Sequence, residues 1–127
     1  MPYTISYLEE KNIIETIYEG KVRVIDVITV IQKNVGLARR YQTGLFLVDC
    51  ALLIDEKEHI FENYDVGTFM TKVLDQLPRT MRDAIILPQN EIGKANLRFF
   101  ETVARNRGVN VQTFEKREDA FAWLLQG

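Results

Sequence analysis

Alternating apolar and polar positions at the start of the chain predict a β-hairpin. Apolar side chains occupy every second position of the segment 3–7, and the segment 13–18 is rich in β-branched residues. The polar stretch between them, 9–12, has the composition of a turn. We therefore expect two paired strands, 3–8 and 13–18, before the first helix.

The segment 23–42 fits a helix better than a strand. Its apolar residues recur at helical spacing, at Val24, Ile28, Ile31 and Val35. Arg39 and Arg40 stand where the negative end of a helix dipole favours cations. The many β-branched residues would also suit a strand, so the length of the segment and the order of the following elements decide for a helix.

Short apolar runs and longer helical patterns alternate in the rest of the chain. The apolar run Leu45 to Val48 is unbroken, which is typical of a parallel strand covered on both faces. We expect this strand to end at Asp49. Two further strands are predicted at 84–87 and 109–114, and helices at 65–77 and 118–126.

The helix between these last two strands has the clearest pattern. Asn90 is suited to cap it, and Gly108 supplies the left-handed residue that ends it. Its predicted core face consists of Ile92, Ala95, Phe99, Phe100 and Val103.

This order of elements predicts an α/β fold. Strands separated by single helices imply right-handed crossovers, and so a mostly parallel sheet of four to five strands with an N-terminal hairpin and about four helices. The chain has 127 residues, which is the size of one domain, so we expect residues 1–127 to form a single domain.

Several short patterns in this order resemble the SpoIIAA-like branch of the STAS family, the anti-sigma factor antagonists, whose fold is also likened to SEC14 lipid-binding domains. They are Tyr18-Glu19-Gly20 before the first helix, Leu47-Val48-Asp49, Ala84-Ile85-Ile86-Leu87, and the ending Glu118-Asp119-Ala120-Phe121-Ala122-Trp123-Leu124. The resemblance covers nearly the whole chain and implies a STAS/SpoIIAA-like fold. It also implies a regulatory role through protein contacts.

The loop that STAS regulators phosphorylate differs here. In those proteins an Asp-Ser-Ser-Gly motif follows the Asp-terminated strand, whereas Glu56 and Lys57 occupy the two serine positions in this chain. Its only serine, Ser6, belongs to the first strand, so serine phosphorylation in this loop is excluded. The Glu56 carboxylate could imitate a phosphoserine charge, although an exposed loop glutamate explains it more simply.

Composition and charge narrow the class of protein. Apolar residues make up 46% of the chain and charged residues 27%, with a net charge of −2, so the chain is neither disordered nor built to span a membrane. Basic residues of the last third are interleaved with acidic ones, which argues against nucleic acid as a partner. A single cysteine and the absence of an export signal favour the cytoplasm, and one Cys with one His cannot supply four zinc ligands.

The polar residues expected at the carboxyl edge of the sheet form the candidate binding site, because open α/β sheets bind ligands there. They are Asp49, Cys50, Asp55, Glu56, His59, Gln89, Asn90 and Lys94. Cys50 and His59 could form a catalytic dyad, but a cysteine after a buried strand is usually a core residue. His59 among carboxylates could sense pH or hold a weak metal site, although a solvated acidic loop is the simpler interpretation. The glycine spacing fits no nucleotide-binding loop, and we expect no cofactor, metal site or catalytic residue.

Two functions follow from these patterns. The leading hypothesis is a non-catalytic interaction or regulatory module with a protein partner, or one that forms a homodimer through an exposed apolar helix face. The alternative is a carrier of a lipid or another small apolar ligand, with Phe61, Tyr64, Phe69 and Met70 around its pocket. A carrier needs a closed apolar cavity between the helix 65–77 and the sheet, and a solid core there would contradict it.

Overall fold

The computed structural model describes residues 2–54 and 64–126, and for residues 64–67 it describes the backbone alone. The elements follow the predicted order. They are the strands β1 (Tyr3–Leu8), β2 (Ile13–Gly20), β3 (Leu45–Leu53), β4 (Arg82–Ile86) and β5 (Val111–Phe114), and the helices α1 (Val24–Tyr41), α2 (Tyr64–Val73), α3 (Glu91–Asn106) and α4 (Arg117–Leu124). A single 3₁₀ turn, Leu74–Gln76, continues α2.

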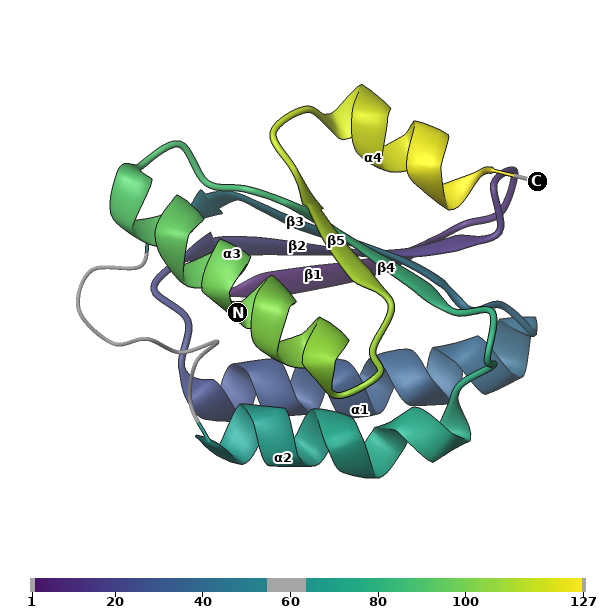
Figure 1. Cartoon of the computed structure of the whole chain (residues 1–127). Helices are drawn as coiled ribbons and strands as arrows, with labels where there is room; N and C mark the ends of the chain where they lie inside the picture. The colour runs from purple at the N-terminus through teal and green to yellow at the C-terminus, as the bar shows by residue number, and fades with distance from the viewer. Residues whose placement is uncertain (1, 55–63, 127) are drawn as a thin grey trace.

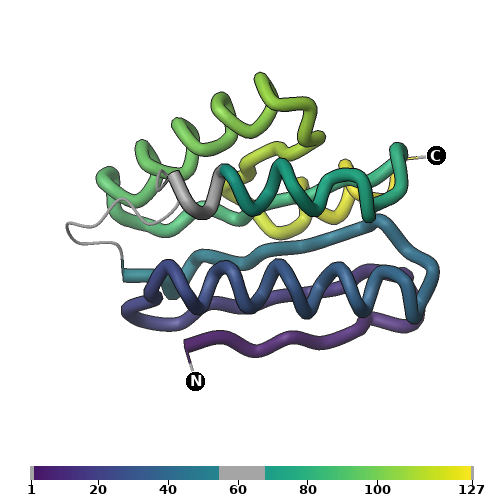
Figure 2. Tube along the Cα trace, turned by 90° about the horizontal axis from the view of Figure 1, so that it is seen from below, coloured from purple at the N-terminus to yellow at the C-terminus, as the bar shows by residue number. Residues whose placement is uncertain are grey.

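The strands form one sheet in the order β1-β2-β3-β4-β5. β1 runs antiparallel to β2, and the other neighbours are parallel. Helices α1, α2 and α3 cover one face of the sheet and α4 covers part of the other, as Figures 1 and 2 show. The predicted α/β class, the N-terminal hairpin and the mostly parallel sheet are confirmed.

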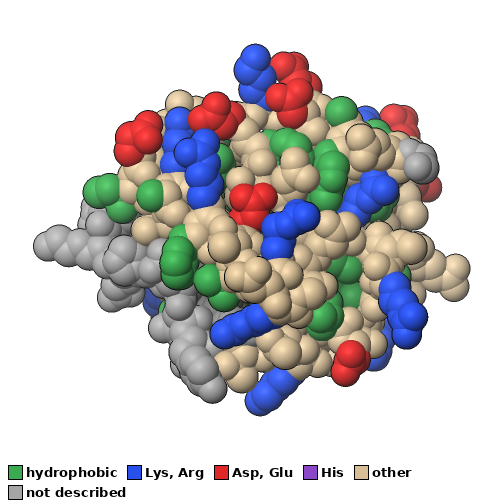
Figure 3. Space-filling view, viewed as in Figure 1, with side chains coloured by type: hydrophobic (Ala, Val, Ile, Leu, Met, Phe, Trp, Pro, Cys, Tyr) green, Lys and Arg blue, Asp and Glu red, His purple; other side chains and the backbone are tan. Residues whose placement is uncertain are grey.

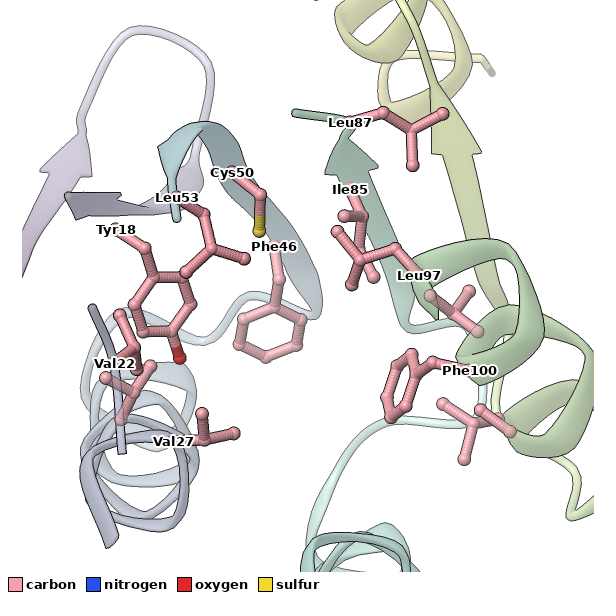
Figure 4. Packing of buried hydrophobic residues seen from close by; sticks show 14 of the residues in the cluster. Tyr18, Val22, Val27, Phe46, Cys50, Leu53, Ile85, Leu87, Leu97 and Phe100 are labelled. Carbon is pink, nitrogen blue, oxygen red and sulfur yellow. The ribbon is translucent and has the colours of Figure 1, made fainter. Parts of the chain in front are cut away.

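Two hydrophobic cores hold these layers together. The larger lies between α1, α2, α3 and the sheet, and includes Tyr18, Phe46, Leu97 and Phe100 (Figure 4). The smaller lies under α4, where Trp123 packs against Phe114 with ring centroids 5.7 Å apart. Trp123 therefore helps to fix the terminal helix on the sheet, as its sequence position indicates.

Strand β3 does not end at Asp49 as expected. It continues to Leu53, because β2 runs beside it to Gly20 and pairs there with Leu53. The register shifts by one residue after Ile17, which is a bulge in this pair. Asp49 consequently lies inside the strand rather than in the following loop.

The predicted core face of α3 is mostly wrong. Ile92, Ala95 and Phe99 point to solvent, and of the predicted face only Phe100 is buried. The buried face is Gly93, Asn96, Leu97, Phe100 and Ala104. Gly93 belongs there because its Cα approaches Pro88 so closely that a Cβ would lie 2.6 Å from the Pro88 Cγ. The helix is rotated by about one residue from the prediction, because a glycine and an asparagine are not recognised as core positions from the sequence.

In α1 the buried apolar residues are Val27, Val30, Val35 and Ala38, so of the predicted stripe only Val35 is fully buried. Val24, Ile28 and Ile31 are half-buried. Because β-branched apolar residues occur on several sides of this helix, their spacing alone does not show which side faces the core.

The cap of α3 is confirmed and gives a test of the fold. The Asn90 side-chain oxygen accepts a hydrogen bond from the Gly93 amide at 2.6 Å. We expect Asn90→Ala to lower the free energy of unfolding by about 1 kcal/mol, measured by urea denaturation, because an orphan helix amide loses its partner. The control is Asn106→Ala in the last turn of the same helix, which should change stability by less than half as much. Equal losses would contradict the capping role.

Candidate functional site

The parallel strands bring their carboxyl ends to one edge, where the candidate binding residues were expected. Asp55, Glu56 and His59, together with Phe61, lie outside the described residues. The other five edge residues can be placed one by one.

Asp49 takes part in a charged cluster on the α4 face of the sheet. Arg117, the first residue of α4, lies between Asp49 of β3 and the buried Glu15 of β2. Its Nη1 is 3.1 Å from Asp49 Oδ2 and its Nη2 contacts Glu15 Oε2. The guanidinium also lies over the Phe121 ring, 5.0 Å from its centroid. Asp49 therefore helps to anchor α4.

Cys50 faces the opposite side of the sheet and is fully buried in the larger core. Its expected place at the edge surface is corrected, because the pleat of β3 turns neighbouring side chains to opposite faces. The simpler interpretation, a small core residue, is the one that the structure supports.

The remaining edge residues have different surroundings. Asn90 caps α3. Lys94 is paired with Glu115 at 3.2 Å and lies 3.9 Å from Glu91. Gln89 is exposed. Whether this edge binds a partner stays a prediction, and most of its described polar groups already have structural contacts.

A second candidate site lies between α1, α2 and the middle of the sheet. A pocket of about 70 Å³ lies there, in the position that the carrier hypothesis required, but it is partly open to solvent and not a closed cavity. Its walls are mainly apolar and include Val30 of α1, Phe46 of β3, Met70 of α2 and Phe100 of α3. Of the four residues expected around a pocket, the structure places Met70 on its wall. Figure 4 shows Phe46 and Phe100 on opposite sides of this space.

Three polar side chains line the same pocket, and sequence reasoning missed all of them. Asn34 donates a hydrogen bond from Nδ2 to Thr16 Oγ1 at 3.3 Å, while its Oδ1 is buried without a hydrogen-bond partner. Asp83 is half-buried as a residue, but its Oδ1 atom is buried and unpaired. Tyr18 is the third. Buried polar atoms are nearly always hydrogen-bonded, so two unpaired ones in one pocket mark it as unusual.

The sheet register places these groups relative to one another. Asp83 pairs with Phe46 on β3, and Thr16, which holds Asn34, pairs with Val48 on the other side of β3. Asn34 of α1 is therefore held at β2 and Asp83 lies on β4, with β3 between these two strands.

Burial changes the acid–base behaviour of this pocket. It raises the pKa of Asp83 to about 7, so the carboxyl group changes charge near neutral pH. Burial also raises the pKa of Tyr18, and the nearby Cys50 and Asp83 add to that effect. Tyr18 is thus a neutral hydroxyl at every pH at which the domain is expected to work.

The described residues offer no site for a metal ion. Among them, no group of three or more His, Cys, Asp and Glu side chains is close enough together to hold one. None of the described helices is both long and apolar enough to cross a membrane.

The fold defines a class: this is an α/β domain with a SpoIIAA-like fold. The chain is similar to the crystal structure of an uncharacterised protein of the DUF3478 family from Shewanella loihica PV-4, which has a SpoIIAA-like fold. The TM-score is 0.61 at 19% sequence identity, over 96% of this chain and 91% of that one. No protein-family model and no curated protein matches the chain. The expected fold is confirmed, while the likeness to SEC14 domains stays a prediction.

Asp83 makes stability depend on pH in a direction opposite to that of most carboxylates. Because its folded pKa lies above the unfolded value of 3.8, the unfolded chain releases this proton first, and stability falls as pH rises from about 4 to 7. A shift of that size corresponds to roughly 4 kcal/mol at most. We expect Asp83→Asn to be more stable than the wild type at pH 8, with an advantage about 2 kcal/mol larger than at pH 5, in urea denaturation at both values.

The control for this comparison is Asp75→Asn, an exposed change in the 3₁₀ turn, which should alter stability equally at both pH values. Asp26, whose pKa is lowered by its hydrogen bond from Arg23, contributes the opposite slope at acid pH. That contribution is present in all three proteins and cancels in the difference. If the difference in free energy of unfolding between Asp83→Asn and wild type is the same at pH 5 and pH 8, the raised pKa of Asp83 is wrong.

Proposed function

We propose that this chain is a non-catalytic interaction module with a regulatory role, and that it binds a second copy of itself through the outer face of α3. One observation carries this proposal. The outer face of α3 is apolar, with Ile92 57% exposed and Phe99 54% exposed, and Ala95 lies between them. Large exposed apolar side chains that share one face mark interaction surfaces more often than isolated ones do.

The three residues form one stripe on a firmly held helix. Ile92 and Phe99 are seven residues apart, so they lie on the same side, two turns or about 10 Å along the axis. The inner side of α3 is anchored by Leu97 and Phe100, both in the larger core. In Figures 1 and 2 the helix lies on the outside of the domain, and Figure 3 shows hydrophobic side chains exposed over it, with charged ones beside them. The stripe is therefore presented to a partner without rearrangement.

Charges around the stripe favour a second copy as the partner. The Glu91 side chain is 89% exposed at one end and the Arg98 side chain 53% exposed near the other. If two copies of α3 pack antiparallel, Ile92 of one meets Phe99 of the other, and Glu91 comes near Arg98 twice by symmetry. The small side chain of Ala95 at the centre lets the helices approach closely. The present partner of Arg98 is Glu115 at 3.5 Å, an exposed pair that is easily exchanged.

The edge residues that the structure describes support the non-catalytic part of the proposal. Asp49, Asn90 and Lys94 make structural contacts, and Cys50 is a core residue. A catalytic group needs a side chain that is free to meet a substrate. The SpoIIAA-like fold of the neighbouring structure agrees with a regulatory role by analogy of fold.

Self-association can be tested by removing the largest member of the stripe. We expect the wild-type chain to sediment as a dimer and Phe99→Ser to sediment as a monomer at the same concentration, because both apolar contacts between Phe99 and Ile92 of the other copy are lost. Leu125→Ser is the matched control: Leu125 is 48% exposed but follows α4 on the other side of the sheet, so that variant should stay dimeric. A wild-type chain that remains monomeric at millimolar concentration would contradict the proposal.

Charge exchange tests the orientation of the two helices. Glu91→Arg and Arg98→Glu should each weaken the dimer, because each places like charges opposite one another. The double variant restores the opposite charges and should regain most of the lost affinity. If the loss of dimer affinity in the double variant equals the sum of the losses in the two single variants, the antiparallel arrangement is wrong.

The second candidate function, binding of a small molecule, is favoured by the pocket between α1, α2 and the sheet. Its volume of about 70 Å³ is well below the roughly 300 Å³ at which pockets for drug-sized ligands begin. A lipid does not fit this space, so the geometry favours a ligand of a few heavy atoms over the lipid carrier.

A further inference from the structure

We infer that the pocket between α1, α2 and the sheet binds a small primary ammonium ion, with the Asp83 carboxylate accepting its N–H hydrogen bonds and the aromatic walls enclosing its hydrocarbon body. This inference rests on the second candidate function, small-molecule binding. It does not depend on the outer face of α3.

The position of Asp83 is the first argument. Its neighbour on the same face of β4 is the buried Ile85, and its pairing partner on the adjacent strand β3 is Phe46. The carboxyl group therefore lies where an apolar residue would normally pack. Asp83 Oδ1 has no hydrogen-bond donor. A buried, unpaired acceptor destabilises a fold, and a bound water, ion or ligand that supplies the missing partner is one explanation for its presence.

The charge inside the pocket is the second argument. Among the described residues that line it there is no Lys or Arg, so Asp83 faces no cation of the protein there. Tyr18 is the other titratable side chain of the lining, and it stays neutral. A carboxylate in these surroundings attracts a ligand cation with N–H donors more strongly than a neutral ligand, because a charge-assisted hydrogen bond is about twice as strong as a neutral one.

The aromatic rings give the third argument. Tyr18, Phe46 and Phe100 line the pocket from three different elements, as Figure 4 shows for their side chains. The faces of aromatic rings carry negative potential and attract ammonium groups, and their apolar surface accepts a hydrocarbon body. A carboxylate with several aromatic rings therefore favours an organic cation over a metal ion or an anion.

The volume limits the size of the ligand. About 70 Å³ is roughly half of the ~150 Å³ cavity that holds one benzene molecule, so the body has about three carbon atoms. We expect a ligand of this size to pair with one of the two unpaired groups, since Asn34 is held at Thr16 of β2 while Asp83 lies on β4, and β3 separates these strands. The carboxylate is the stronger acceptor for a cation, so the ammonium belongs at Asp83.

Ordered water is the competing occupant, because a polar pocket of this volume holds water that could satisfy Asn34 and Asp83. A titration of the full chain separates the two cases, with the ¹³C-labelled methyl groups of Val30, Val73 and Ile85 as reporters inside the pocket. The probes are n-propylammonium and 1-propanol, which have the same carbon chain and differ in charge. At pH 8, where Asp83 is ionised, we expect saturable shifts of these methyl groups with n-propylammonium and binding at least about tenfold weaker with 1-propanol.

Two variants complete the test. Asp83→Asn keeps the shape of the side chain and should weaken n-propylammonium about tenfold or more, while Asp75→Asn on the surface should bind like the wild type. Lowering the pH from 8 to 6 should weaken binding to the wild type because Asp83 regains its proton, and should not affect Asp83→Asn.

Two results would overturn the inference in different ways. If neither probe shifts the pocket methyl groups, the pocket holds water only, and small-molecule binding fails with the inference. If 1-propanol binds as well as n-propylammonium and Asp83→Asn changes nothing, the pocket binds small molecules, but the ammonium assignment is wrong.

Discussion

Strand β3 is hydrogen-bonded to β2 on one side and to β4 on the other, and its side chains alternate between two hydrophobic cores. A parallel strand in this position needs both faces covered, because its backbone and its apolar side chains would otherwise meet water. Helices α1, α2 and α3 cover one face, and α4 the other. The placement of every helix follows from this requirement.

The two faces are covered in different ways. On the α4 face a short helix suffices because Arg117 ties its first turn to Glu15 and Asp49, and Trp123 packs near its end. On the other face three helices meet above β2, β3 and β4, and their side chains leave a pocket between α1 and α2. Asp83 points into it from β4, so an unsatisfied polar atom lies where the helices leave this space.

The order and type of the elements could be predicted because periodicity and caps are local signals. Asn90 and Gly108, for example, have the predicted roles at the two ends of α3. The side of α3 that is buried could not be predicted, since it depends on a close contact between Gly93 and Pro88. The pocket was foreseen only as a requirement of the carrier hypothesis. Its polar residues were missed because Asn34 lies in an ambiguous helix and Asp83 precedes an apolar run, where it reads as the polar start of a strand.

The outer face of α3 and the pocket share a helix, because Phe99 belongs to the first and the neighbouring Phe100 to the second. A ligand can alter association through α3 only if it binds the associated and free states with different affinities. α3 is held to β5 by Glu101, which accepts two hydrogen bonds from Thr113 at 2.8 and 3.0 Å, and by Arg105, which donates to the Val111 carbonyl at 2.8 Å. On the far wall, α2 contributes flexible Met70 and passes into a 3₁₀ turn after Val73. We therefore expect α2 to move more readily than α3 when a ligand binds. The apolar stripe on α3 then stays in place whether the pocket is filled or not.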